Sequence, residues 1–116
     1  MQRVTNETRG KLLGDQVREA RTFLTRLKGL LGTRAMPVGQ GLHIVPCNSI
    51  HTFFMSLSID AVFLDRSHRV VKVCPAMAPW RVSGVYLSAH SVLELPAGVA
   101  LASGTVVGDQ LRFEAR

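Results

Sequence analysis

The chain has 116 residues, of which 47% are hydrophobic, 19% charged and 6% aromatic, and its formal net charge is +6. This length supplies one hydrophobic core, and the composition argues against a disordered chain. No apolar run approaches the roughly 20 residues of a membrane-spanning helix.

The first residues are polar and show no sustained periodicity. We therefore expect residues 1–12 to be a flexible lead-in to a single globular domain over 13–116. Because this segment lacks the apolar stretch of a secretory signal, the sequence predicts a cytoplasmic protein. Residues 16–20 have the pattern of a short strand. From Thr22, which is a suitable N-cap, to Leu31 the apolar positions form one helical stripe, which predicts an amphipathic helix.

The rest of the chain favours β structure. A tight turn at 65–68 is expected to join two apolar runs into a β-hairpin. Residues 99–103 predict one helical turn that is closed by Gly104. These elements together predict an α+β fold with a mainly antiparallel sheet, an N-terminal amphipathic helix and one short C-terminal helical turn. The apolar runs assigned to β structure are 42–45, 50–55, 59–64, 70–73, 91–95 and 110–113.

Reactive side chains are concentrated in residues 46–55. On an extended segment Cys47, Ser49 and His51 point to one side, because side chains alternate along a strand. A thiol beside an imidazole can supply a thiolate nucleophile. The sequence shows no third group to orient such a pair, so catalysis by Cys47 and His51 stays an alternative.

A metal site is a second reading of the same residues. Cys47 and His51 can be combined with Cys74 and His90, with His43 as a spare, into a Cys₂His₂ set. Their spacing matches no compact zinc pattern. The alternative is that the two cysteines are reduced and pack as small hydrophobic residues, while the histidines lie at strand edges.

Polar and aromatic residues suggest a ligand site. Asp60 opens a strongly apolar strand, where a carboxylate needs hydrogen-bond partners or water. It is either a polar anchor in a pocket walled by His51 and Phe53, or a turn-capping carboxylate that accepts backbone N–H groups. Trp80 and Arg81 either line such a site or cover the core. The candidate ligand-binding residues are His51, Phe53, Met55, Asp60, Trp80 and Arg81.

Positive charge is concentrated near the N-terminus. Residues 1–34 hold eight Lys or Arg against three acids, a balance of +5, whereas the other 82 residues hold six against five. A basic segment can attract nucleic acid or an anionic surface. The scarcity of aromatic rings for base stacking weighs against nucleic acid. The alternative is a solvated face that keeps the domain soluble.

Three segments occur in an order typical of one family. They are residues 26–32, the Phe-Phe-Met run that leads to residues 57–60, and residues 92–98 with Gly-Asp at 108–109. In these features the chain resembles a widespread prokaryotic family known only as domain of unknown function 192. Two features differ from the family pattern: Ser-Leu-Ser at 56–58 replaces the common Lys-Asn-Thr, and His68 stands where the hairpin turn usually has Gly. The resemblance implies a compact, partly closed, barrel-like β fold with peripheral helices, and no assigned activity.

The sequence lacks the motifs of the standard enzyme classes, among them the phosphate loop, the nucleophile elbow and the dinucleotide fingerprint. The leading hypothesis is a non-catalytic binding module for a small ligand or a protein partner. One alternative is an enzyme or metal protein that uses Cys47 and His51, and another is nucleic-acid or anionic-surface binding through the basic N-terminal segment. We expect no cofactor, and a monomer or a homodimer.

Overall fold

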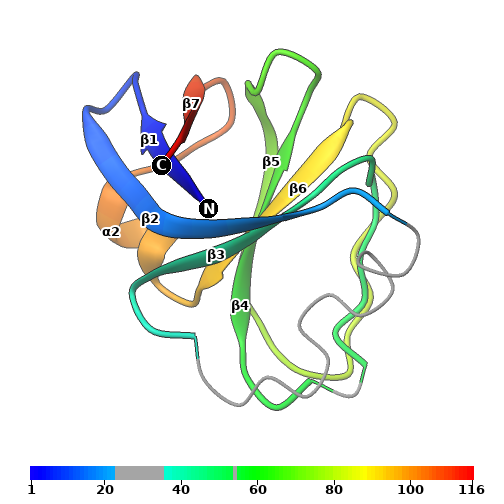
Figure 1. Cartoon of the computed structure of the whole chain (residues 1–116). Coiled ribbons are helices and arrows are strands. Elements are labelled where there is room, and N and C mark those ends of the chain that lie inside the picture. Colours follow the sequence, from blue (N-terminus) through cyan, green and yellow to red (C-terminus); the bar gives the residue numbers. More distant parts are fainter. Residues whose placement is uncertain (23–35, 54) are drawn as a thin grey trace.

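The computed structural model describes residues 1–22, 36–53 and 55–116, and Figure 1 shows their arrangement. Within these residues most of the regular structure is β, with one short helix near the C-terminus. The elements are β1 (Gln2–Asn6), β2 (Lys11–Ala20), β3 (Gly39–Ile44), β4 (Ile59–Leu64), β5 (Val70–Met77), β6 (Ser91–Pro96), α2 (Val99–Ser103) and β7 (Leu111–Ala115).

The seven strands form one sheet in the order β5-β4-β6-β3-β2-β1-β7. Neighbouring strands are antiparallel except β2 and β3, which are parallel. The sheet curls until the start of β5 meets the start of β7, where Leu111 N–H donates to the His68 carbonyl at 3.0 Å and Val70 N–H to the Asp109 carbonyl at 2.8 Å. The two chain ends lie close together in Figure 1. The sheet is therefore partly closed, as expected for a barrel-like fold.

Side chains from the two faces of the sheet form two separate hydrophobic clusters. Because side chains alternate along a strand, β4 contributes to both clusters, and all six of its residues are buried. The Phe63 cluster consists of Ala20, Leu42, Ile44, Ile50, Met55, Ile59, Ala61, Phe63 and Val92. The Leu93 cluster consists of Val4, Leu13, Val17, Val62, Leu64, Val70, Leu93, Leu95 and Leu111.

Several local predictions are confirmed. The turn at 65–68 joins β4 and β5 into an antiparallel hairpin, with His68 in the left-handed region at φ 64°. The helical turn at 99–103 is α2, and Gly104 ends it at φ 70°. The short strand expected at 16–20 is the second half of β2.

The lead-in expected at residues 1–12 is wrong, because β1 and the start of β2 occupy it. Val4 is completely buried in the Leu93 cluster, and β1 pairs with β7 more than 100 residues away. Local periodicity does not show a partner at that distance. The amphipathic helix predicted over Thr22–Leu31 falls, after Thr22, on residues outside the described ones, and the first described element is the strand β1.

The strand expected at 50–55 is also wrong for the residues described there. This segment is a loop in which His51 makes a single antiparallel bridge to Val82. Its apolar side chains are buried for another reason: Ile50 and Met55 cover the Phe63 cluster. The loop and residues 78–83 therefore form a layer over this face of the sheet.

Candidate functional site

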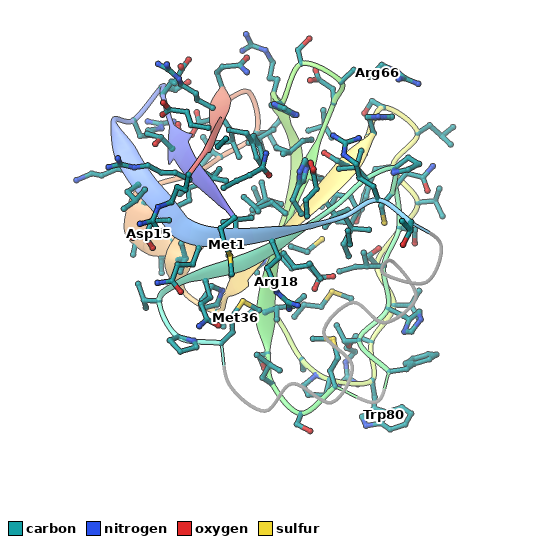
Figure 2. All side chains as sticks on the ribbon, viewed as in Figure 1. Met1, Asp15, Arg18, Met36, Arg66 and Trp80 are labelled. Atoms are coloured by element: carbon teal, nitrogen blue, oxygen red, sulfur yellow. The ribbon has the colours of Figure 1, made fainter. Side chains whose placement is uncertain are left out.

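Three rings lie in a row where this loop layer reaches the surface. The centroids of His51 and Phe53 are 5.0 Å apart, and those of Phe53 and Trp80 are 5.7 Å apart with an interplanar angle of 28°. We call His51, Phe53 and Trp80 the aromatic cluster. Trp80 is 55% exposed, and Figure 2 shows it at the periphery of the molecule, away from the sheet.

Thr52 positions the aromatic cluster from below. Its side chain is completely buried, and its hydroxyl accepts Arg81 N–H at 2.8 Å and donates to the Ala78 carbonyl at 2.7 Å. Its backbone carbonyl accepts Trp80 N–H at 3.0 Å, and its own N–H donates to the Arg81 carbonyl at 2.9 Å. One threonine thus holds residues 78–81 against the neighbouring loop through both backbone and side chain.

Trp80 adopts a backbone conformation that is costly for a bulky residue. Its φ of 62° lies in the left-handed region, which favours glycine. The hydrogen bonds from Thr52 to both sides of this residue impose that conformation. Backbone strain of this kind occurs disproportionately at ligand clamps and other functional sites. The structure therefore holds Trp80 in a defined place while leaving much of its ring exposed.

Two further candidate residues lie beside or beneath this cluster. Arg81 is exposed and directly follows Trp80, whose carbonyl accepts its guanidinium at 3.5 Å. Met55 donates its N–H to the Thr52 carbonyl at 3.3 Å, but its side chain is buried in the Phe63 cluster. Met55 can thus support the surface from within but offers little of itself to a partner.

Asp60 has a different environment from the other candidates. It is 1% exposed, and its Oδ1 accepts Ala76 N–H at 2.8 Å. Its Oδ2 accepts Gly98 N–H at 3.1 Å and Ala100 N–H at 2.8 Å, at the start of α2. These contacts match the turn-capping alternative, because the carboxylate accepts backbone N–H groups from an irregular position of β5 and from the start of the short helix.

The residues considered for nucleophilic or metal chemistry are held by their own loop. The Cys47 thiol donates to the Ser49 carbonyl at 3.1 Å, and His51 Nδ1 accepts Phe53 N–H at 3.3 Å. Cys47 and His90 line a hollow of about 280 Å³. Within residues 1–22, 36–53 and 55–116, no three or more His, Cys, Asp or Glu side chains are grouped to hold a metal ion. The proposed Cys₂His₂ set is therefore not assembled.

Glu94 is a candidate that the sequence analysis did not single out. It lies in the middle of β6 and is 4% exposed, and its Oε2 has no hydrogen-bond partner among the residues that the structure describes. Burial raises the pKa of this carboxyl to about 7. The sequence places Glu94 in a run with Val92, Leu93 and Leu95, but only the structure shows that all six residues of β6 are buried.

His43 is a buried titratable residue on the opposite face of the sheet. It is 2% exposed, and its ring packs 4.4 Å from Phe113 and 5.7 Å from His68 between centroids. Glu19 Oε1 lies 3.5 Å from Nδ1, but neither ring nitrogen makes a hydrogen bond with any described residue. Burial lowers the pKa of His43 to about 4, with the nearby His68 acting in the same direction. The imidazole is therefore neutral near pH 7.

Part of the basic N-terminal charge is neutralised within the fold. Arg9 Nε lies 3.0 Å from Asp109 Oδ2, and Arg21 Nε lies 3.0 Å from Glu19 Oε2. Asn6 donates to the same Asp109 oxygen at 2.9 Å. These contacts place two of the arginines of residues 1–22 in ion pairs within the fold, a structural role that neither sequence-based alternative for this charge included.

The curled seven-stranded sheet and its loop layer with exposed rings define a small β-rich protein of the barrel-like type. No helix in the described part of the chain is both long and apolar enough to cross a membrane. The family model for domain of unknown function 192, described as "Uncharacterized ACR", matches residues 4–113. The chain therefore belongs to this family.

Proteins similar to this chain over most of its length carry the name UPF0127 protein. A UPF0127 protein of Thermococcus sibiricus is 36% identical over 114 residues, which cover 94% of this chain and 73% of that protein. A UPF0127 protein of Pyrococcus horikoshii is 32% identical, with coverage of 95% and 97%.

Solved structures show the same fold. A protein of unknown function from Novosphingobium aromaticivorans matches with a TM-score of 0.83 at 21% identity, covering 96% of this chain and 82% of that one. A suggested transcription regulator of Sinorhizobium meliloti matches with a TM-score of 0.82, also at 21% identity, covering 97% and 91%. At this identity the likeness concerns the fold alone.

Proposed function

We propose that this protein is a non-catalytic binding module and that the aromatic cluster, together with Arg81, is its contact surface. The observation that carries the proposal is the state of Trp80. The residue is more than half exposed, while its hydrogen bonds with Thr52 hold its backbone in the left-handed region. Burial of the ring in the core would explain such a conformation, but the ring is not buried there. A surface that must present the ring to a partner explains both features.

A protein partner fits this surface better than a small ligand. Tryptophan and arginine are the residues most often found at the centre of protein interfaces. The apolar side chains of Val82, Val85 and Leu87, which follow in the same loop, are also exposed. Rings and aliphatic groups along one loop offer an extended apolar contact with one adjacent charge. This arrangement suits the surface of another protein.

The single tryptophan makes the proposal directly testable. Trp80 fluorescence reports only on this site, so a partner that covers the ring changes the emission of the native chain. A photo-crosslinker at position 80 would identify the partner, and titration with the purified partner would then give the affinity. We expect Trp80→Ala to weaken binding by about 30-fold, because a hot-spot aromatic contributes about 2 kcal/mol.

The matched control is Leu101→Ala. Leu101 is 86% exposed in α2 and is another large apolar side chain at the surface. We expect its replacement to leave the affinity unchanged. Equal affinities of Trp80→Ala and the native chain, or unchanged Trp80 emission at saturation, would contradict the proposal. Native mass spectrometry of gently purified protein would instead favour a small ligand if a bound mass is lost in Trp80→Ala.

A further inference from the structure

The Glu94 carboxylate points into the Phe63 cluster. Its direct strand partners are Leu42 in β3 and Ala61 in β4, and both belong to that cluster. The adjacent Leu93 and Leu95 belong to the other cluster. Because side chains opposite each other in a sheet share a face, Glu94 enters the layer between the sheet and residues 46–58.

No residue of the chain compensates this carboxylate where the structure describes it. Two cations lie on the same face at the sides of the sheet, Arg18 in register with Leu42 and Lys72 in register with Phe63. Neither forms an ion pair with Glu94, and Lys72 Nζ lies 5.8 Å from the centre of the Tyr86 ring. Among the described residues, Glu94 Oε2 has no hydrogen-bond partner although it is buried, which is costly and makes this oxygen suited to a ligand that donates a hydrogen bond.

The walls around Glu94 can adapt to such a partner. Ala61, directly opposite Glu94 in β4, has only a methyl group. Methionines 36, 55 and 77 contribute to the Phe63 cluster or pack against it. Methionine has three rotatable bonds and fills irregular spaces, so this lining can rearrange around an inserted chain.

The chemistry of the walls indicates the class of ligand. A carboxylate acceptor binds best a group that is positive and donates several hydrogen bonds. The surrounding aliphatic and thioether groups require the rest of the ligand to be apolar. A metal ion is disfavoured, because the described residues bring no second and third His, Cys, Asp or Glu to the site. A primary ammonium group on an alkyl chain meets both requirements.

We propose that Glu94 anchors an interior binding site for a primary alkylammonium group, whose chain lies against the side chains of the Phe63 cluster. This proposal does not depend on the aromatic cluster. The ammonium ion would donate hydrogen bonds to the carboxylate and hold it in its ionised form. The side chains of Met36, Met55 and Met77 would have to shift to admit the ligand.

The test is a titration of ¹³C-labelled protein with n-pentylammonium at neutral pH, followed through the Glu94 carboxyl resonance. The expected result is a saturable shift toward the ionised carboxylate. The neutral control ligand is n-pentanol, which has the same chain without the charge. We expect Glu94→Gln to bind n-pentylammonium at least tenfold more weakly. Glu114→Gln, at an exposed carboxylate in β7, should bind it like the native chain.

Three outcomes would overturn the proposal. They are the absence of a saturable shift in the native chain, equal affinity in Glu94→Gln, and n-pentanol binding as tightly as n-pentylammonium. The carboxyl resonance of the native chain decides the question by itself if Glu94→Gln does not fold. Unchanged Trp80 emission during this titration would separate the interior site from the surface of the aromatic cluster.

Discussion

Replacement of Glu94 by glutamine should change how stability depends on pH. Glutamine has nearly the same shape and cannot ionise, so the comparison isolates the charge. Glu94 is 4% exposed, and burial raises its pKa from 4.5 to about 7. The folded chain therefore holds this proton over a pH range in which the unfolded chain has lost it. Linkage then requires stability to change across the same range.

The sign and size of the effect follow from these two values. The contribution of protonated Glu94 to the free energy of unfolding is fully present below about pH 4.5 and is lost as pH rises to about 7. At about 1.4 kcal/mol for each pH unit, the loss amounts to about 3 kcal/mol. His43 acts in the opposite direction, because its pKa is lowered from 6.5 to about 4 and its contribution is lost as pH falls. The native chain alone would therefore show only a partial trend.

His43 lies on the opposite face of the sheet and is present in both the native chain and Glu94→Gln. Its effect therefore cancels when the unfolding free energies of these two chains are subtracted. We would unfold the native chain and Glu94→Gln with urea at several pH values between 4.5 and 8. At each pH the experiment gives the difference between their free energies of unfolding. We expect this difference to move by about 3 kcal/mol in favour of glutamine as pH rises. Glu114→Gln should show no such trend. A difference between the native chain and Glu94→Gln that is constant over this range would refute a raised pKa for Glu94.

Other substitutions test the framework of the candidate site. Thr52→Val should cost about 1 to 2 kcal/mol and increase acrylamide quenching of Trp80, because the hydroxyl that holds its loop is lost, whereas Thr52→Ser should retain both properties. If Thr52→Val leaves the acrylamide quenching of Trp80 unchanged, the hydroxyl does not hold this loop. Asp60→Ala leaves three backbone N–H groups without an acceptor, so we expect urea unfolding to show a loss of about 2 to 4 kcal/mol with unchanged Trp80 emission. Asp109→Ala should cost about 1 to 3 kcal/mol in the same assay, since the buried Asn6 amide and the Val106 N–H lose their acceptor. If either variant unfolds at the same urea midpoint as the native chain, the structural role given to that aspartate is refuted.

The parts of the fold that could be predicted depend on neighbours in sequence. The hairpin of β4 and β5 and the short helix α2 follow from alternation, turn residues and a closing glycine. Strand β1 could not be found in this way, because its partner β7 is distant in sequence. The strand predicted from the apolar run at 50–55 was wrong for a related reason. Its side chains are buried against a sheet to which the segment does not belong.

The candidate site shows the same division. The sequence grouped His51, Phe53 and Trp80, and the structure brings these rings into contact. Asp60 was grouped with them because it follows closely in the chain, although its hydrogen bonds lead to β5 and α2. Glu94 was overlooked because a single acid in a strand does not reveal its depth. Only the sheet register shows that its neighbours on both sides are buried.

The position of β1 between β2 and β7 makes the two ends of the chain depend on each other. Gln2 pairs with Ala115, and Arg116 N–H donates to the Met1 carbonyl at 3.2 Å. β7 lies at the margin of the sheet, with β1 as its neighbouring strand. Trimming the first six residues would thus unseat the last strand as well. Conversely, a short peptide joining residue 116 to residue 1 would span a small gap, so circular permutants opened at a surface turn should keep the sheet intact.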